Sequence, residues 1–432
     1  MLMRVEDAGM TRRQRRALLR RWRKTARKRG VPSPSAMFRY LEKFHDPHQE
    51  MLRKKSGKKA FIPAPNEYLQ GFAKVNGDMA AWAQKKQPER TATLDLDATL
   101  IETTKAKALY SYKKFKSYQP LNVWWSEQLV MLHTEFRDGN VPAGFDILRV
   151  FVESLALLPD GVEEVRVRSD TAAYQHEFLR YMALGKNERF GVIKFVIGCD
   201  VTPEFKKAVA EVEEDEWKPI TRFKNGRFEA TGQEYAEVCF VPRGMGLGKK
   251  DPSYRYIAIR EPMEEQCLPG LEEQQKLPFQ TIRLQKKRYK LFGVVTNFAN
   301  PEAPESKGEG WDGEKVVKFY RKRCGKSEEA HAVLKSDLAG GILPSADFGE
   351  NAAWWWMSIL AMNLNNLLKR HVLQGDWEDR RMKALRYGLI RIAGRVIEHA
   401  RRLIIRISGE HPAYRLLLEA RARIAELALS PG

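Results

Sequence analysis

Two aspartates follow stretches whose alternation predicts β-strands. In "TATLDLDATLI" (91–101) apolar and polar residues alternate, so Asp95 and Asp97 share one face and Asp97 stands near the strand end. The alternating "VRVRS" likewise runs out at Asp170. Carboxylates at strand ends offer the oxygen ligands that hard divalent cations prefer, and two such ions about 4 Å apart promote in-line displacement at a phosphate. The alternative is that each Asp caps a turn or helix.

A third carboxylate stands between basic residues on a predicted helix that begins near Glu314. Arg321, Glu328 and Lys335 are spaced by seven residues and therefore fall on one helical face. Beside a metal site, the acid would be a ligand and the two bases would hold phosphates. An exposed stripe of salt bridges is the alternative.

The charge of the chain indicates a polyanionic partner. Lys and Arg number 75 against 55 Asp and Glu, which gives a formal net charge of +20. Nucleic acid fits this balance best. The four cysteines have no C-x-x-C spacing, which argues against a zinc ribbon or disulfide framework. No apolar run reaches the length of a membrane span, so we expect a cytoplasmic protein without a membrane partner.

The most basic segment lies at the N-terminus. Between Arg12 and Arg29 there are eleven Lys or Arg residues and few apolar ones, followed by short amphipathic helices on basic tethers. We interpret residues 1–90 as a helical basic DNA-binding region. Its candidate phosphate contacts are Arg12, Arg15, Arg16 and Arg20.

The order of predicted elements gives an α/β fold. Residues 91–199 contain three strands, a helix, a strand, a helix and a strand. Residues 200–311 contain β-rich runs and an Asn-Gly hairpin signal, which predict an insertion. Helical periodicity returns in 312–370 and continues through 371–432, where we predict a basic amphipathic helix from about Trp377 to Ile405 and a shorter one after Pro412. The C-terminal region is a candidate for dimerisation or DNA contact.

Three motifs together resemble one family. "TLDLDATLI", "VRVRSDTAAY" and the segment from "YRKRCGKSEEAHAVLK" to "NNLLKR" resemble bacterial insertion-sequence transposases of the DDE type. The resemblance covers roughly residues 90–410 and implies an RNase H-like catalytic core interrupted by the β-rich insertion, with helical N- and C-terminal regions. It also implies the catalytic and metal-binding triad Asp97, Asp170 and Glu328, and a Tyr-Arg-Glu-Lys signature at Tyr320, Arg323, Glu328 and Lys335.

The same resemblance implies an activity and its partners. The expected function is cut-and-paste transposition: binding terminal inverted repeats in double-stranded DNA, cleaving with two Mg²⁺ or Mn²⁺ ions per active site, and joining the 3′ end to target DNA. A homodimer that forms on DNA, in the bacterial cytoplasm with the nucleoid, is expected. The alternatives are an RNase H-like nuclease without strand transfer and a non-catalytic DNA-binding regulator. A supercoiled-plasmid assay distinguishes these three.

Several assignments stay open at this level. Asp95 competes with Asp97, and Glu329 competes with Glu328, for the metal. One extra residue separates Arg323 from Glu328 relative to the family pattern, so Arg321 competes with Arg323 for the phosphate. Trp217 and Trp311 flank the predicted insertion; each either stacks on an unpaired base in a DNA-hairpin route or packs in the protein.

Overall fold

The structure is a computed structural model of the 432-residue chain. It describes residues 32–224, 226–242, 251–263, 279–285, 287–302, 306, 310–399, 402–407, 409–411 and 413–429. The N-terminal arginines 12, 15, 16 and 20 therefore lie outside the described residues.

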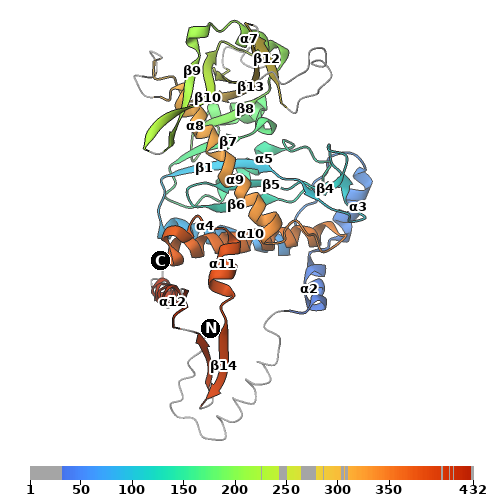
Figure 1. Ribbon diagram of the computed structural model, residues 1–432. Coiled ribbons are helices and arrows are strands. Elements are labelled where there is room, and N and C mark those ends of the chain that lie inside the picture. Colours follow the sequence, from blue (N-terminus) through green and yellow to red (C-terminus); the bar gives the residue numbers. More distant parts are fainter. Residues whose placement is uncertain are drawn as a thin grey trace, which may run out of the picture.

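A single mixed sheet forms the centre of the molecule (Figure 1). Its path is β6-β5-β1-β7-β8-β13-β11-β10-β9, and β12 pairs with β13. The strands are β1 Thr91–Ala98, β5 Leu121–Trp125, β6 Val130–Glu135, β7 Glu164–Ser169, β8 Lys194–Cys199, β9 Lys218–Lys224, β10 Arg227–Val238, β11 Arg255–Pro262, β12 Thr281–Leu284 and β13 Lys287–Thr296. β1, β5 and β6 are antiparallel neighbours, whereas β1, β7 and β8 run parallel. This mixed α/β arrangement is consistent with an RNase H-like core.

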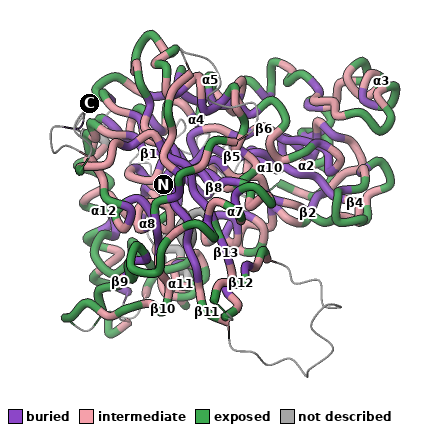
Figure 2. The backbone as a smooth tube through the Cα atoms, turned by 90° about the horizontal axis from the view of Figure 1, so that it is seen from above, coloured by how far each residue is buried: buried purple, intermediate pink, exposed green. Residues whose placement is uncertain are grey.

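Helices cover both faces of the sheet, and the buried residues concentrate along its central strands (Figure 2). They are α2 Pro34–Leu41, α3 Pro47–Ser56, α4 Glu67–Lys86, α5 Ile147–Ala156, α6 His176–Ala183, α7 Pro203–Ala210, α8 Gly313–Arg321, α9 Arg323–Ala332, α10 Phe348–Leu368, α11 Met382–Leu385 and α12 Ala413–Leu429. Trp125 on β5 joins the core that contains α5, and its neighbour Trp124 joins the core that contains α10. Side chains of successive strand residues point to opposite faces, so one strand supplies both cores. No helix in the described part of the chain combines the length and apolar character needed to cross a membrane.

The helices of residues 32–90 are part of the central core. Leu41 and Phe44 are almost fully buried in the cluster that includes α10, and Arg53 forms a buried ion pair with Asp138. On α4, Asn76 donates to the carbonyls of Met131 and Leu132 at the free edge of β6. The expectation of helices on tethers is therefore wrong for this segment, because their apolar faces pack against α10.

The predicted insertion is β-rich, and it extends the same sheet. β13 pairs antiparallel with β8, from Gly293 opposite Cys199 to Thr296 opposite Val196. β9 and β10 flank the Asn-Gly signal. The strands of residues 218–296 thus add to the sheet beyond β8.

Two predictions of local structure are wrong. The sequence "KALYSYKKF" (107–115) predicts the second of the three strands in residues 91–199. The structure instead has the short strands β2 Ile101–Glu102, β3 Leu109–Tyr110 and β4 Lys116–Tyr118, which form a separate small sheet. The helix predicted from Trp377 to Ile405 is replaced by short helical turns, with Gly388 near their end, and by a hairpin of β14 Gly394–His399 and β15 Arg402–Ile407. Glycine and β-branched residues disfavour helix in this segment and favour strands. The helix after Pro412 is confirmed as α12.

Candidate active site

Asp97 and Asp170 come together at the ends of two neighbouring parallel strands. The register of β1 and β7 ends with Leu96 opposite Ser169, so each aspartate follows one residue later at the same edge of the sheet. Burial and the negative charge of Asp97 raise the pKa of Asp170, whereas Arg323 and the Ala172 N–H lower it. The mutual repulsion of the two carboxylates is the electrostatic condition that a bound divalent cation relieves.

Asp95 forms a buried ion pair with Arg168. Its carboxylate accepts two hydrogen bonds from Arg168, Nε to Oδ1 at 2.6 Å and Nη2 to Oδ2 at 2.8 Å. Both side chains are almost completely buried, and Arg168 also donates to Ser126 Oγ and to the Phe319 carbonyl. Both oxygens of the Asp95 carboxylate are thus held in an ion pair with Arg168. This favours Asp97 over Asp95 as the metal ligand.

Helix α9 brings two side chains to Asp97. Arg323 Nη1 lies 3.6 Å from Asp97 Oδ2, and His331 Nδ1 lies 3.4 Å from the same oxygen. The Asp97 side chain keeps 17% of its surface exposed, so it remains open to solvent. Arg323 therefore lies next to the acid pair.

Arg321 and Tyr320 have separate surroundings. Arg321 donates to Gln233 Oε1 on β10, away from Asp97. The Tyr320 hydroxyl lies near Gly198 on β8: a Cβ added there would be 3.0 Å from that oxygen and 3.2 Å from the Thr171 nitrogen. Because Gly198 has no side chain, the Tyr320 hydroxyl fits beside the turn that follows Asp170. The Arg323 guanidinium lies 5.9 Å from the centre of the Tyr320 ring.

The remaining candidate residues lie on α9 or in the helical turn that follows it: Glu328, Glu329 and Lys335. Glu328 lies on this helix one turn before His331, and its side chain is outside the described part of the structure. Glu329 lines a different pocket, together with Trp124, Lys369 and Arg381. Lys335 is half-buried in the π-helical turn Val333–Asp337 that follows α9.

Trp217 and Trp311 both pack within the protein. The Arg260 guanidinium lies 4.1 Å from the centre of the buried Trp217 ring. Trp311 stacks on Phe298 with ring centroids 3.9 Å apart. These contacts support packing within the protein, not stacking on an unpaired base, for both residues.

Sequence reasoning missed His331 and its partner Asn122. His331 has no second histidine at metal-ligand spacing. Asn122, whose Nδ2 lies 3.1 Å from His331 Nε2, belongs to β5, whereas "SYQPLN" (117–122) is typical of a loop between two predicted strands. The signal that was available is the three-residue interval from Glu328 to His331, which places them on one face of a helix.

The donor set of the acid pair suits a hard cation, because it consists of carboxylate oxygens at one sheet edge. His45, Glu50 and Asp347 form another cluster with metal-ligand proximity in the described residues. There, however, Glu50 pairs with Arg53 and accepts from the Phe348 N–H, while Asp347 pairs with Lys107. Those charges are neutralised within the protein, so this cluster is a poorer cation site.

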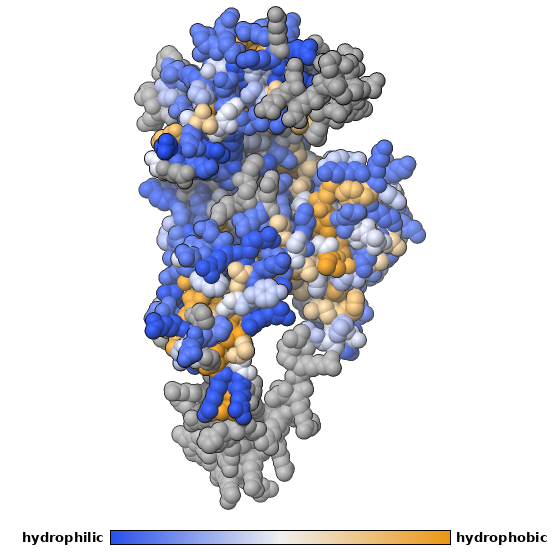
Figure 3. All heavy atoms as spheres, in the orientation of Figure 1, coloured by the Kyte–Doolittle hydropathy of each residue, from blue (hydrophilic) through white to orange (hydrophobic). Residues whose placement is uncertain are grey.

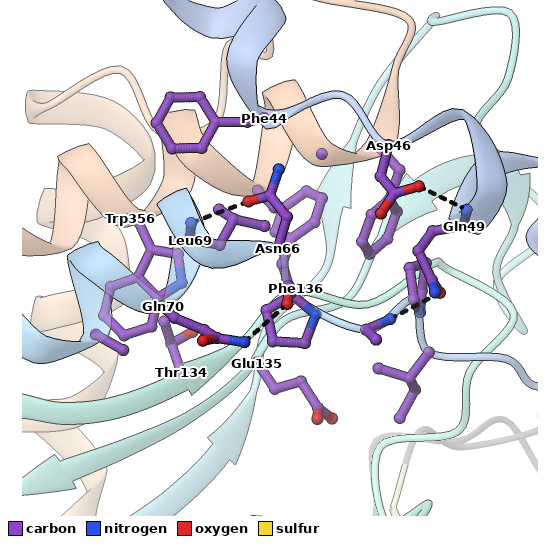
Figure 4. Close-up of a pocket in the computed structure, with 18 of the residues that line it drawn as sticks. Phe44, Asp46, Gln49, Asn66, Leu69, Gln70, Thr134, Glu135, Phe136 and Trp356 are labelled. Atoms are coloured by element: carbon purple, nitrogen blue, oxygen red, sulfur yellow. Dashed lines mark hydrogen bonds between the residues drawn. The ribbon is translucent and has the colours of Figure 1, made fainter.

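One pocket of about 560 Å³ lies apart from the acids. It is bounded by the 60–66 segment, β6 and α10, and its walls include Phe44, Leu69 and Trp356 (Figure 4). Polar groups along it are used locally: Asn66 accepts from the Leu69 N–H and Asp46 accepts from the Gln49 N–H. Neither Asp97 nor Asp170 lines it, so it is separate from the acid pair.

Comparison with known proteins adds a family match. Residues 276–429 match the family described as Transposase DDE domain group 1. This segment is similar to a DDE transposase domain. The match includes Glu328, whereas Asp97 and Asp170 lie outside it. No curated protein matches the chain.

Two solved transposase structures are similar at low identity. One is a piggyBac transposase synaptic complex with hairpin DNA, at 11% identity and a TM-score of 0.36, covering 63% of this chain and 46% of that one. The other is a Drosophila P element transposase strand transfer complex, at 15% identity and a TM-score of 0.19, covering 51% of this chain and 54% of that one. The chain thus spans about half the length of either.

Proposed function

We propose that this chain is a DNA transposase of an insertion sequence that cuts its own ends and joins them to target DNA. The observation that carries the proposal is the meeting of Asp97 and Asp170 at adjacent strand ends, faced by Arg323 from a helix within the DDE-matched segment. The acids are Asp97, Asp170 and Glu328. We place the activity in the bacterial cytoplasm, on nucleoid DNA.

The chain's own residues hold and orient the reacting phosphate. Asp97, Asp170 and Glu328 would hold Mg²⁺ or Mn²⁺, two ions per site, and these ions would supply activation of the attacking oxygen and stabilisation of the leaving one. Arg323 and Tyr320 stand beside the acid pair, where a phosphate oxygen finds a cation and a hydroxyl donor. Arg321 and Lys335 contact DNA farther along the same helical segment. Water attack leaves a 3′ hydroxyl, which then attacks a phosphodiester of the target and displaces its 3′ oxygen.

The regions divide the work of DNA binding. Residues 1–90 recognise the element ends, chiefly through the arginines between Arg12 and Arg29. Residues 91–199 and 312–370 form the catalytic core, and 200–311 form the insertion.

The C-terminal region 371–432 contributes a β-ribbon. In β14 and β15, Arg395 stands directly opposite Arg406 and both are exposed. The hairpin projects from the body of the molecule, with hydrophilic surface flanking an apolar centre (Figure 3). Like charges directly opposed on a ribbon repel each other until counter-charges neutralise them, and a two-stranded ribbon fits the DNA major groove. Two protomers assemble around two DNA ends in this proposal.

A supercoiled plasmid carrying the element ends tests the function with Mg²⁺ or Mn²⁺. Strand-transfer products support the proposal. Nicks without joining identify an RNase H-like nuclease, and binding without any metal-dependent change identifies a regulator.

A further inference from the structure

A chain of polar contacts leads from the core of the molecule to Asp97. Trp355 Nε1 lies 3.0 Å from Thr134 Oγ1, Thr134 Oγ1 lies 2.7 Å from Asn122 Oδ1, and Asn122 Nδ2 lies 3.1 Å from His331 Nε2. His331 Nδ1 then faces Asp97 Oδ2 at 3.4 Å. All the residues before Asp97 are buried.

The direction of donation follows from the first group. An indole N–H only donates, so the Thr134 oxygen accepts from Trp355. The Thr134 hydroxyl then donates to Asn122 Oδ1, which is a carbonyl oxygen and only accepts. The Asn122 amide nitrogen is thereby turned to His331, and it donates a hydrogen bond that Nε2 accepts. An imidazole that accepts at Nε2 is neutral and carries its proton on Nδ1.

We propose that His331 is a positioning residue for Asp97: the buried chain fixes the Nδ1–H tautomer, and this N–H orients the carboxylate through Oδ2. Arg323 approaches the same oxygen, so helix α9 places two nitrogen-bearing side chains on one side of Asp97. The inference rests on the proposed function, in which Asp97 holds the metal. Partners that orient a metal-ligating carboxylate in this way affect metal affinity as well as rate.

Direct ligation by His331 is the competing role. It would require the lone pair on Nδ1 and therefore a proton on Nε2, against the direction of the chain. Hard cations such as Mg²⁺ also favour oxygen over imidazole nitrogen. Positioning is the role that both the contacts and the cation chemistry favour.

Three substitutions separate orientation of Asp97 from packing. The amide nitrogen of Asn stands at the δ position, as Nδ1 does, whereas that of Gln stands at the ε position. His331→Asn therefore keeps a donor toward Asp97, and His331→Gln keeps a contact toward Asn122. We expect His331→Ala and His331→Gln to weaken Mn²⁺ binding about 10- to 100-fold and His331→Asn to retain most of it.

Mn²⁺ affinity is measured by titration calorimetry, and folding by thermal unfolding without metal. His371→Ala serves as the control, because His371 is half-buried against Trp82 and not beside the acids. If His331→Gln binds Mn²⁺ like the wild type while His331→Asn does not, or if His331→Ala lowers only the unfolding temperature, the positioning role is wrong. If Asp97→Asn also leaves Mn²⁺ affinity unchanged, the proposed metal site fails instead.

The tautomer itself is read by ¹⁵N NMR of the metal-free protein. The expected spectrum has a protonated Nδ1 and an unprotonated Nε2 at His331. A proton on Nε2 alone would overturn the proposal, because Nδ1 would then have a lone pair and no proton to donate to Asp97. Thr134→Val should remove the preference, because Asn122 loses the hydroxyl that orients its amide.

Discussion

Asp95 stands directly opposite Arg168 in the parallel pairing of β1 and β7, and the two side chains are joined by two hydrogen bonds inside the core. Asp97, two residues later on the same face of the strand, is partly exposed and lies beside Asp170 at the sheet edge. Two aspartates of one strand thus have different surroundings, and their substitutions should fail in different ways.

Replacing Asp95 should chiefly cost stability. Asp95→Asn leaves Arg168 charged, buried and without its carboxylate, which typically costs about 3–5 kcal/mol of unfolding free energy. Urea denaturation of this variant and of Asp97→Asn provides the comparison. We expect Asp97→Asn to stay close to the wild type, since its side chain is partly exposed. Equal losses in the two variants would contradict the structural role of Asp95.

Replacing any acid of the proposed triad should stop DNA cleavage and joining without preventing DNA binding. Asp97→Asn, Asp170→Asn and Glu328→Gln should each abolish cleavage and joining while DNA binding stays within a few fold, because only the chemical step needs the metals. Cleavage and gel-shift assays on one end substrate measure both. Glu329→Gln is the matched control, since Glu329 lines the pocket beside Lys369 and Arg381. An inactive Glu329→Gln beside an active Glu328→Gln would shift the assignment by one residue.

The raised pKa of Asp170 gives a pH dependence. Burial and Asp97 disfavour its ionised form in the folded chain, so folding is favoured at low pH and loses this contribution as the pH rises through the folded pKa. Asp170→Asn removes the repulsion and keeps an oxygen for the Ala172 N–H. Without metal, the variant should unfold at a higher temperature than the wild type at neutral pH. The difference should shrink as the pH falls toward 3.8, the ordinary value for Asp; a gain that persists there would have another cause.

Removing the arginine-rich N-terminus should abolish specific end binding without unfolding the core. A chain lacking residues 1–31 retains Leu41 and Phe44, which pack with α10, and Arg53, which pairs with Asp138. A chain lacking residues 1–60 loses these contacts and should be markedly less stable. Competition gel shifts with end and random DNA, together with thermal unfolding, measure the two effects. Selective binding by the shorter deletion would assign end recognition to another region.

The exposed arginines of the hairpin should contribute to the salt dependence of DNA binding. Arg395→Gln with Arg406→Gln removes two phosphate contacts, so the slope of log affinity against log salt should fall by roughly two. Arg415→Gln with Arg421→Gln makes the same charge change on exposed positions of α12. Fluorescence anisotropy over a salt series measures both double variants. An equal loss of slope in the two would reduce the effect to net charge.

Sequence alternation was sufficient to predict the strands that carry Asp97 and Asp170, because both strands are regular and end at polar turns. It could not separate Asp95 from Asp97, since a period of two gives them the same face and the deciding partner, Arg168, is 73 residues away. Burial of Arg168 also had no local signal, because an alternating Arg ordinarily predicts an exposed position.

The C-terminal error has a different origin. Leu385, Leu389 and Ile392 recur at helical spacing, but the residues that follow contain the adjacent β-branched pairs Val396–Ile397 and Ile404–Ile405, which are compatible with a helix or a strand. Periodicity alone does not choose between these readings in so short a run, and the branched side chains favour the strand.

β13 also covers the edge of β8. Without the strands of residues 218–296, the apolar run "KFVIGC" of Lys194–Cys199 would be an open sheet edge, whose free N–H and C=O groups could accept a strand from another molecule. A shortened chain that joins β8 directly to α8 would therefore keep all three candidate acids and yet be prone to edge-to-edge aggregation. In the proposed catalytic core, the inserted strands thus cover the β8 edge and keep it from pairing with other molecules.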